Sequence, residues 1–331
     1  MANAAFFSDN AFQINRVFGE GRKEWLQAEL DFFPEIVSSE SFARHLPALQ
    51  QVEFVFSTWG MLQLNEEQIA QLPALMAVFY AAGSVQYFAR PFLSRGVKVL
   101  SAWGANAVPV AQFTVAQIIL AAKGYFMAER ICRTSAGRNS FNNHYPGLFR
   151  TPISLLGAGM VGAKVIELLK PYALNILAFD PFLSQERADE LCVERVSLEQ
   201  AFQNGFVVSN HLANLPETRQ MLTRSLFESL QPYATFINTG RGATVDEAGM
   251  LAVLARRPDL TALLDVTEPE PPQPDSPIYQ LENVLLSPHI AGSIDREVLR
   301  QADYMLEEYR RFKNGEPLLY SVSLEMLKTM A

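Results

Sequence analysis

The segment from Thr151 to Pro181 constrains the fold of this chain more than any other part of its sequence. The apolar run Ile153 to Leu156 predicts a short buried strand, and apolar residues at helical intervals predict a helix from Met160 to about Leu169. A second apolar run, Ile176 to Phe179, predicts the next strand. Between the first strand and the helix, glycines follow the G-x-G-x-x-G spacing at Gly157, Gly159 and Gly162. The segment therefore has the pattern of a βαβ unit with a glycine turn.

The glycine turn and Asp180 together predict a dinucleotide site. The first glycine permits a tight turn, the second lets the backbone approach a pyrophosphate, and the third allows close helix–strand packing. Free N–H groups at the helix start can then bind the phosphates. Asp180 lies 18 residues after Gly162, where a carboxylate can accept hydrogen bonds from an adenosine ribose. Because this carboxylate would repel a 2′-phosphate, and no Arg follows it until Arg187, NAD is favoured over NADP.

A glycine triplet alone is equally compatible with an ordinary turn. Length and composition give separate information on the class of protein. A chain of 331 residues is long for one hydrophobic core and suits two domains. With 49% hydrophobic and 19% charged residues it has the composition of a soluble globular enzyme. A net charge of −8 argues against nucleic acid or an anionic membrane as a partner. Residues 1–10 show no secretory signal, so we expect a cytoplasmic location.

The apolar stretch from Ala107 to Met127 is predicted to be a long helix capped by Asn106, with Pro109 in its first turn. Polar residues interrupt it at Gln112, Thr114, Gln117 and Lys123. We therefore expect a core or interface helix rather than a membrane span. The only cysteines, Cys132 and Cys192, are too few for a disulfide framework and suit a reducing cytoplasm. For either of them, a small core residue is the commoner role.

Residues before Trp103 are predicted to form a small α/β unit. Its strands are Val52 to Phe56, Leu75 to Tyr80 and Val97 to Leu100, and a helix capped by Asn65 runs to Leu72. Strands that alternate with helices imply a parallel sheet. The turn Ala81 to Gln86 follows the second strand, at the end where ligands of open α/β sheets usually bind. Gly137 to Arg150 is polar and Asn-rich, and is predicted to be a loop.

The same alternation continues beyond Pro181. Further strands are predicted at Phe206 to Ser209, Ala234 to Asn238, Thr261 to Asp265 and Val284 to Leu286, helices start at Ser197 and Asp246, and an amphipathic helix spans Glu297 to Phe312. The predicted fold class is α/β with two domains, in which a doubly wound Rossmann sheet is inserted in a smaller flavodoxin-like domain. We expect the NAD-binding domain at 104–294, and the substrate domain at 1–103 and 295–331.

Three residues that can do chemistry follow strands of the second domain: Arg241, Glu270 and His289. Parallel strands would place all three at the edge that holds the glycine turn. Singly, each has a simpler explanation: Arg241 as a solvated charge in a glycine turn, Glu270 as a surface acid between two prolines, and His289 as a strand-end cap. Their common position favours a joint catalytic role.

The chemistry of this set suits hydride transfer between NAD and a small 2-hydroxy or 2-keto acid. Such a substrate needs a base for its hydroxyl proton and, in reverse, an acid for the ketone oxygen, and His289 suits both tasks. Glu270 would fix the tautomer of the imidazole. Arg241 can bind the substrate carboxylate through two hydrogen bonds, while NAD supplies the redox chemistry.

The other histidines are interpreted differently. His211 also follows a strand, but no acidic residue accompanies it in the sequence, so we interpret it as a pocket-lining group near the cofactor. His45, next to Arg44, is expected to have no catalytic part, and His144 has no assigned role. No metal site is expected.

The motifs LLGAGMVG with FDP, NTGRGATVDE, LLDVTEPEPP and LLSPHIAGS resemble, in this order, the NAD-dependent D-2-hydroxyacid dehydrogenase family, over about Ala102 to Ser293. The resemblance implies that Arg241, Glu270 and His289 are catalytic. Glu270 is preferred to Glu268 because it has the family's spacing from the strand-end Asp. The substrate carboxylate would be bound by Gly83, Ser84, Val85 and Arg241. The predicted cofactor-binding residues are Gly157, Gly159, Met160, Val161, Gly162, Asp180, His211, Leu212, Ala213, Thr239, Gly240, Arg241, Asp265, His289 and Gly292.

Some features depart from that family or leave alternatives open. Family members that take phosphorylated acids need cationic side chains in the first domain, and Ser57 to Met61 contain neither Arg nor Lys, so phosphoglycerate is disfavoured. The resemblance implies a homodimer. It also leaves an NAD(H)-sensing, corepressor-like binding protein as the alternative to an enzyme. Four aromatic residues of the first domain either line an apolar substrate wall or fill the core: Trp59, Tyr87, Phe88 and Trp103.

Overall fold

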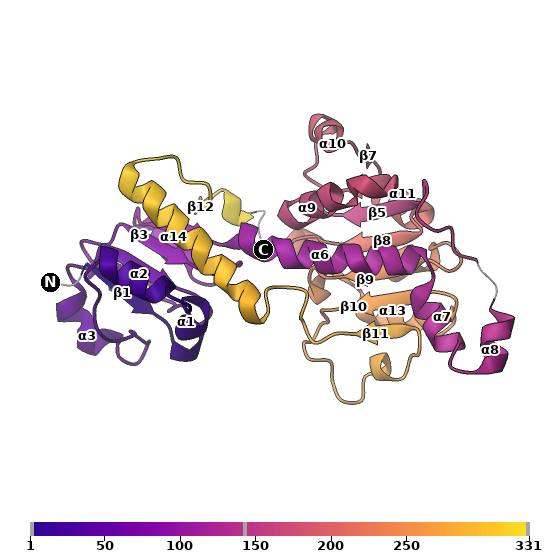
Figure 1. Cartoon of the computed structure of the whole chain (residues 1–331), viewed down its shortest axis with the longest axis horizontal. Helices are drawn as coiled ribbons and strands as arrows, with labels where there is room; N and C mark the ends of the chain where they lie inside the picture. Colours follow the sequence, from indigo (N-terminus) through magenta and orange to yellow (C-terminus); the bar gives the residue numbers. More distant parts are fainter. Residues whose placement is uncertain (1–2, 142–143, 329–331) are drawn as a thin grey trace. The chain divides into compact units, whose positions relative to one another are not determined.

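The computed structural model describes residues 3–141 and 144–328. Over these residues the chain forms two compact units, each with its own sheet (Figure 1). Unit 1 comprises Met1–Asn106 and Ser293–Ala331, and unit 2 comprises Ala107–Gly292. The sequence places these boundaries after residues 103 and 294. Residues 142–143 of the predicted loop 137–150 lie outside the described residues.

The sheet of unit 1 has the strand order β1-β2-β3-β4-β12. Its strands are β1 (Ala4–Phe7), β2 (Phe54–Ser57), β3 (Ala77–Tyr80), β4 (Lys98–Ser101) and β12 (Ser321–Val322). The first four pair in parallel, and β12 joins β4 antiparallel. Phe32 and Val37 form isolated parallel bridges to β1. With that segment counted as the second strand, the parallel order is 2-1-3-4-5, which is the flavodoxin-like order.

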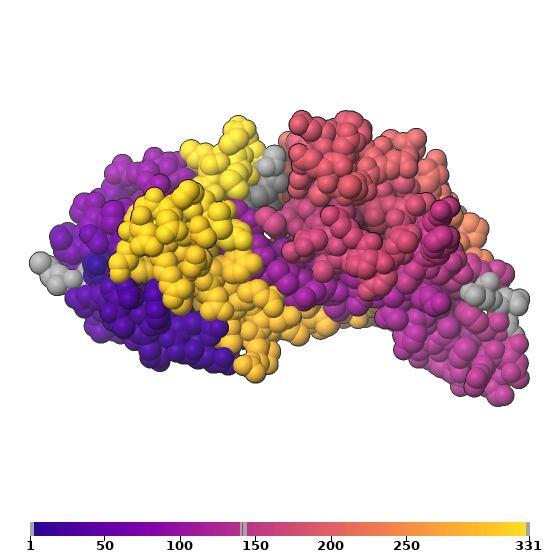
Figure 2. All heavy atoms as spheres, turned by 45° about the horizontal axis from the view of Figure 1, so that its top comes forward, coloured from indigo at the N-terminus to yellow at the C-terminus, as the bar shows by residue number. Residues whose placement is uncertain are grey.

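Helices cover both faces of this sheet, because successive strand residues point to opposite sides. One face packs against α1 (Ala11–Val17), α2 (Arg22–Glu29) and α14 (Val298–Asn314), and the other against α3 (Phe42–Leu49), α4 (Glu66–Ala70) and α5 (Ala89–Ser94). Asn65 caps α4 in a reciprocal capping box with Gln68. The predicted C-terminal helix is α14, and Figure 2 shows it against N-terminal residues of the same unit. Arg22 and Asp303 join α2 to α14 through hydrogen bonds of 2.7 and 2.9 Å.

The sheet of unit 2 is entirely parallel, with the order β11-β10-β9-β8-β5-β6-β7. Its strands are β5 (Pro152–Leu156), β6 (Asn175–Phe179), β7 (Glu194–Arg195), β8 (Val207–Asn210), β9 (Thr235–Asn238), β10 (Thr261–Leu264) and β11 (Val284–Leu286). Numbered within the unit, this is the Rossmann order 3-2-1-4-5-6 with one further strand. The winding reverses between β5 and β8, where the dinucleotide site of such a sheet lies. The fold class predicted from the sequence is confirmed.

Two layers of helices cover this sheet. One face packs against α6 (Trp103–Ala122), α9 (Met160–Leu169) and α10 (Gln185–Leu191), and the other against α11 (Leu198–Asn204), α12 (Arg224–Glu228) and α13 (Glu247–Leu254). After α6 come α7 (Tyr125–Ile131) and α8 (Ser135–Ser140). Short 3₁₀ turns occur at Lys170–Tyr172, Pro216–Thr218, Gly242–Thr244, Pro277–Tyr279, Asp295–Glu297 and Met326–Lys328.

The long apolar helix differs from its prediction at both ends. Asn106 is not its cap, because α6 already begins at Trp103 and the Asn106 N–H donates to Ala102 O, 3.1 Å away. The helix ends at Ala122, and Gly124 with φ 72° separates it from α7. Among the described residues, α6 is the one helix long and apolar enough to cross a membrane. Its buried side chains pack on the sheet of unit 2.

Three further predictions were wrong or incomplete. The polar segment 137–150 is not wholly a loop, because the Thr134 side chain caps the helix α8, which extends to Ser140. Cys132 and Cys192 are exposed rather than core residues, since each ends a helix at the surface. The strand β1 was not predicted at all, although all four of its residues are buried.

Candidate active site

Six of the seven described strands of unit 2, all except β7, end at one common level. Their paired final residues are Leu156, Phe179, Asn210, Asn238, Leu264 and Leu286. The residue after each strand therefore lies at the same edge of the sheet: Gly157, Asp180, His211, Thr239, Asp265 and Ser287. Five of these six are predicted cofactor-binding residues. The sheet register thus gathers them without any long excursion of the chain.

The glycine turn leaves no room for side chains at two of its three positions. Gly157 has φ 98°, and a Cβ there would lie 2.7 Å from the carbonyl oxygen of His211. A Cβ on Gly162 would lie 2.0 Å from the carbonyl oxygen of Gly157. A Cβ on Gly159, in contrast, would meet no atom within 4 Å. The turn is therefore closed around Gly157 and Gly162, and open space lies in front of Gly159.

The start of α9 and Asp180 border this open space. Gly159 is the N-cap of α9, and the first intrahelical bond runs from Ala163 N to Gly159 O at 2.8 Å. In the described part of the chain the N–H groups of Met160 and Val161 have no acceptor, as expected of a first helical turn. The Asp180 carboxylate accepts from Ala158 N, in the glycine turn, and from Phe182 N, each at 2.8 Å. Asp180 therefore fixes the turn, and each of its oxygens keeps a further lone pair for a ligand.

His211 belongs to a chain of hydroxyl contacts. Its Nε2 is 3.0 Å from Ser209 Oγ and its Nδ1 is 3.4 Å from Thr239 Oγ1, and that hydroxyl is in turn 3.0 Å from Thr114 Oγ1 on α6. No described carboxylate contacts the ring. Burial lowers the pKa of His211 to about 4. The imidazole is accordingly neutral at physiological pH.

Arg241 follows β9 in a turn tied to its own strand. The Asn238 side chain donates to Arg241 O at 3.3 Å and accepts from Gly240 N at 3.1 Å. The guanidinium donates one hydrogen bond, from Nη1 to Gly240 O at 2.8 Å, and none of its other N–H groups has an acceptor among the described residues. Burial lowers the pKa of Arg241, and the charge of Glu270 opposes that effect. A partly buried cation with free donors is suited to bind a carboxylate.

His289 and Glu270 form a direct pair. His289 Nδ1 lies 2.5 Å from Glu270 Oε1, and the two side chains are 49% and 41% exposed. His289 has φ 54°, in the left-handed region, so the chain turns at this residue instead of continuing as an extended strand. No described residue contacts Nε2 of His289, so the second ring nitrogen is available to a ligand. The pair lines a cavity of about 470 Å³ together with apolar residues that include Pro272, Tyr279 and Leu286.

Asp265 holds the loop that carries His289. Its carboxylate accepts from Ser287 Oγ at 2.5 Å, from Ile290 N at 2.9 Å and from Ala291 N at 2.8 Å. The backbone N–H of His289 donates to Asp265 O at 3.1 Å. Because Asp265 is almost completely buried, these bonds satisfy its charge and fix the loop. Asp265 was predicted as a cofactor contact, and the structure gives its carboxylate this internal task.

The predicted substrate loop in unit 1 presents free backbone donors. The carbonyl oxygens behind it are held by hydroxyls: Thr58 Oγ1 donates to Ala81 O at 2.8 Å, and Ser101 Oγ to Ala82 O at 2.9 Å and Gly83 O at 2.6 Å. Within residues 3–141 and 144–328, nothing accepts a hydrogen bond from the N–H groups of the predicted residues Gly83, Ser84 and Val85. Neighbouring free N–H groups form a concave site suited to an anion.

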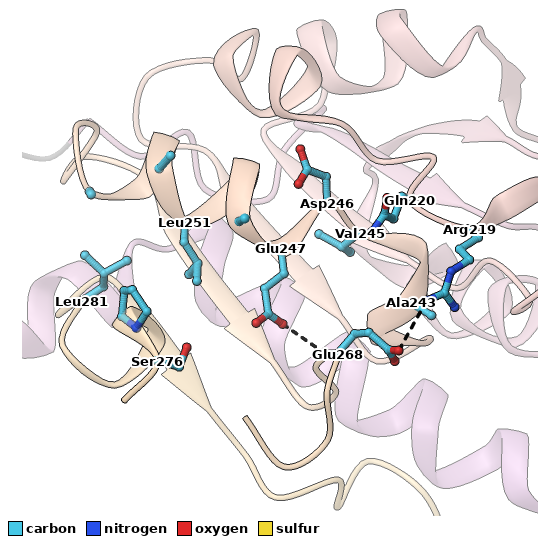
Figure 3. A pocket seen from close by; sticks show the side chains of 14 residues that line it. Arg219, Gln220, Ala243, Val245, Asp246, Glu247, Leu251, Glu268, Ser276 and Leu281 are labelled. Atoms are coloured by element: carbon cyan, nitrogen blue, oxygen red, sulfur yellow. Dashed lines mark hydrogen bonds and ion pairs between the residues drawn. The ribbon is translucent and has the colours of Figure 1, made fainter. Parts of the chain in front are cut away.

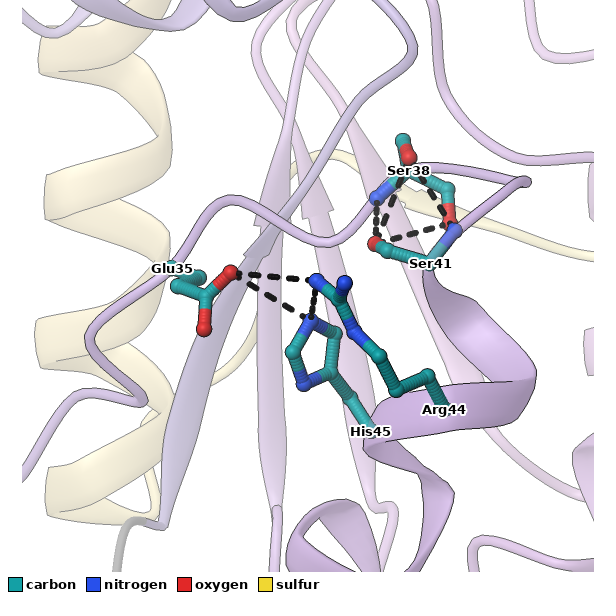
Figure 4. A network of polar contacts seen from close by, with 5 residues as sticks. All are labelled: Glu35, Ser38, Ser41, Arg44 and His45. Carbon is teal, nitrogen blue, oxygen red and sulfur yellow. Dashed lines mark hydrogen bonds and ion pairs between the residues drawn. The ribbon is translucent and has the colours of Figure 1, made fainter.

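The remaining histidines lie in structural contacts. Figure 4 shows that His45, Arg44 and Glu35 contact one another: Nε2 of His45 is 3.4 Å from the carboxylate and 3.0 Å from the guanidinium. In the same view, Ser38 and Ser41 exchange hydrogen bonds ahead of α3. The His45 ring also packs edge-on against Phe33. His144 stacks on Tyr233 at 4.4 Å between ring centroids. These contacts give neither ring a ligand-binding position.

Of the four aromatic residues predicted either to line a substrate wall or to fill the core, three belong to the core or pack against it. Phe88 is a core residue, and Trp59 and Trp103 pack against the core while partly buried. Tyr87 is 41% exposed, and its hydroxyl lies 3.1 Å from that of the buried Tyr80. Tyr87 is thus the one of the four that presents much surface to a ligand.

Comparison with known proteins decides the family of this arrangement. A sequence model of the D-isomer specific 2-hydroxyacid dehydrogenase NAD-binding domain matches residues 115–291, more than half of the chain. The chain is also 30% identical over 270 residues to a glyoxylate reductase of Korarchaeum cryptofilum, which covers 80% of this chain and 81% of that protein. The chain belongs to the D-2-hydroxyacid dehydrogenase family. Unit 2 is its NAD-binding domain.

Other dehydrogenases are similar over a smaller share of their length. The chain is 30% identical over 235 residues to a D-3-phosphoglycerate dehydrogenase of Archaeoglobus fulgidus, covering 71% of this chain but 44% of that enzyme. The chain thus spans less than half the length of that relative.

Solved structures agree on the fold. A phosphoglycerate oxidoreductase from Rhizobium etli has a TM-score of 0.81 at 20% identity and covers 99% of this chain and 100% of its own. The D-mandelate dehydrogenase of Rhodotorula graminis has a TM-score of 0.77 at 19% identity and covers 98% of both chains.

The residues of unit 2 fit an NAD molecule. Gly159 opens onto free space beside the N–H groups of Met160 and Val161, which is the arrangement that a pyrophosphate requires. Of the other predicted contacts, Leu212 is a core residue, so its backbone alone faces the edge, and the Ala213 carbonyl accepts from Thr218. Gly240 follows Thr239, and a Cβ there would crowd Asn210 O at 3.1 Å. Gly292 is the last residue of unit 2.

Four hydroxyl residues that contact the predicted site residues were not predicted from the sequence. In unit 1, Thr58 and Ser101 donate to carbonyl oxygens of the predicted substrate loop. In unit 2, Thr114 contacts Thr239 and Ser287 donates to Asp265. Of these four, only Ser287 stands in one of the motifs, LLSPHIAGS, and no role was predicted for it. The other three are fully buried, and each is a polar residue in or next to an apolar run. Such a residue needs an internal partner, and that need is the signal that would have drawn attention to them.

Proposed function

We propose that the protein is an NAD-dependent oxidoreductase that transfers hydride between NAD(H) and C2 of a small D-2-hydroxy or 2-keto acid. The observation that supports this most is the His289–Glu270 pair, 2.5 Å apart, on the same sheet edge as the glycine turn. An acid/base group and a dinucleotide turn at one edge are what such a reaction needs.

In the direction of reduction, the Arg241 guanidinium binds the substrate carboxylate. The free N–H groups of Gly83, Ser84 and Val85 in unit 1 are a second set of donors suited to a carboxylate. Bound NADH would supply the hydride to C2. His289 donates a proton from Nε2 to the ketone oxygen, so that the product carries the added hydride and proton as a 2-hydroxy acid. Glu270 accepts the hydrogen bond from Nδ1 and thereby leaves Nε2 as the nitrogen that exchanges a proton with substrate.

We infer that the substrate is small and carries no phosphate. The residues Ser57 to Met61, which begin at the last residue of β2, include no cation. The Thr58 hydroxyl in that stretch already donates to Ala81 O. The glyoxylate reductase relative, which aligns over most of both chains, supports a 2-keto acid of that size. NAD rather than NADP, a homodimer and a cytoplasmic location belong to the same proposal.

A panel of 2-keto acids tests this proposal through NADH oxidation followed by absorbance. The panel contains glyoxylate, pyruvate, hydroxypyruvate, phosphohydroxypyruvate and phenylpyruvate, each with NADH and with NADPH. We expect turnover with an unphosphorylated acid and a preference for NADH. NADH binding without turnover across the panel would instead support an NAD(H)-sensing protein.

A further inference from the structure

The segment Thr267 to Pro272, which carries Glu270, is packed against the Arg241 turn. A Cβ on Gly242 would lie 2.1 Å from both the carbonyl carbon and the carbonyl oxygen of Thr267, so the two backbones are in direct contact. The Thr267 hydroxyl also donates to Pro269 O at 2.8 Å and stiffens the segment internally. These contacts hold the beginning of the segment, Thr267 and Glu268, against the Arg241 turn.

One side chain outside the segment reaches its backbone. Glu247 is the first residue of α13, and its Oε2 accepts a hydrogen bond from Glu268 N at 3.1 Å (Figure 3). The Glu268 side chain turns the other way, where its Oε1 lies 3.7 Å from Arg219. Glu247 and Glu268 both line a cavity of about 630 Å³ beside α13. The N–H group that Glu247 holds therefore lies two residues before Glu270, and its acceptor belongs to the first residue of α13.

The surroundings of Glu247 disfavour the charged form of its carboxylate. Burial raises its pKa, and the nearby charge of Glu268 raises it further, while the Glu268 N–H opposes both effects. A carboxylate with no partner would be better placed in solvent. The hydrogen bond to the segment is the one favourable contact recorded for this side chain in the described structure.

We propose that Glu247 is a positioning residue of the dehydrogenase: by holding Glu268 N–H it fixes the segment so that Glu270 meets Nδ1 of His289. This inference rests on the proposed function. Glu247 does not touch substrate or cofactor, and it acts through Glu270. In metal sites, loss of a residue that orients a ligand typically lowers affinity or activity about 10-fold to 100-fold, and we expect an effect at the lower end of that range here.

Two variants of Glu247 test the role. Glu247→Ala removes the acceptor, and we expect kcat for the 2-keto acid to fall at least tenfold while KM and the Kd of NADH stay within twofold. Glu247→Gln keeps an acceptor oxygen, and we expect kcat within threefold of the wild type. Glu186→Ala is the matched control, because Glu186 lies in the first turn of α10 and its loss removes a helix-end charge without a tether.

Hydrogen exchange of the 267–272 peptide, measured without substrate, supplies a second readout. We expect the Glu268 amide to exchange faster in Glu247→Ala only. The role is overturned if Glu247→Ala retains kcat within threefold of the wild type, or if Glu247→Gln loses as much kcat as Glu247→Ala. If the wild-type protein shows no turnover, both the proposed function and this role of Glu247 are wrong. If the wild type is active and Glu247→Ala is equally active, only the role of Glu247 is wrong.

Discussion

His211 offers the sharpest quantitative prediction, because both of its ring nitrogens contact hydroxyls and its pKa is lowered by burial to about 4. At pH 5.5 a group with that pKa is about 3% protonated, whereas a solvated histidine with a pKa near 6.5 is about 90% protonated. The proton therefore prefers the unfolded chain. The neutral His211 ring therefore makes its full contribution to the free energy of unfolding above about pH 6.5. This contribution is lost as the pH falls toward 4.

The expected loss between pH 7.5 and pH 5.5 is about 1.3 kcal/mol. The size of this loss depends mainly on the pKa of His211 in the unfolded chain. In the folded protein, a pKa of 4 or of 4.5 leaves His211 nearly neutral at pH 5.5. Two measurements check it. The Hε1 resonance of His211, assigned by its absence in His211→Gln, should not titrate between pH 7.5 and pH 5.5. The wild-type unfolding free energy in urea should fall by about 1.3 kcal/mol relative to that of His211→Gln over the same interval.

His144→Gln serves as the control, because His144 stacks on Tyr233 in an exposed position and should leave that difference unchanged. A His211 titration midpoint above about pH 5.5 would refute the reasoning. In that case the ring would be charged at working pH, and it would have to be reconsidered as a proton donor.

Three further substitutions test separate parts of the site. Gly162→Ala places a Cβ 2.0 Å from Gly157 O and should raise the Kd of NADH at least tenfold in a fluorescence titration, and an unchanged Kd would count against the turn. Ser101→Ala frees two loop carbonyls and should raise KM for the 2-keto acid about 2-fold to 10-fold with kcat within twofold, so a pure kcat effect would contradict this role. Asp180→Ala should lower the ratio of the NADPH to the NADH Kd, and a constant ratio would exclude Asp180 as the selecting group.

Much of this site follows from the sequence because parallel strands align their own ends. Once Ile153 to Leu156 and the later apolar runs are taken as strands of one sheet, Asp180, His211, Thr239 and Asp265 must lie at one edge. That inference uses local patterns and one topological rule. It needs no knowledge of side-chain contacts.

The contacts that shape the edge are not predictable in the same way. Ser101 bonds to Gly83, and Glu247 to Glu268, across separations that no local pattern records. Asn106 looked like a helix cap because it precedes an apolar stretch. In the structure its side chain accepts from Ser293 N and Gln301 Nε2, two partners from the far end of the chain. Such long-range partners exist only after the units have folded.

The central claim is that His289 exchanges a proton with substrate while the glycine turn binds the dinucleotide. Single-turnover oxidation of bound NADH by the preferred 2-keto acid, compared between the wild type, His289→Asn and His211→Asn, tests it most directly. We expect His289→Asn to lose about 10²-fold to 10⁴-fold in rate with an NADH Kd within twofold, and His211→Asn to lose far less. A His289→Asn protein that oxidises NADH within threefold of the wild-type rate would contradict it.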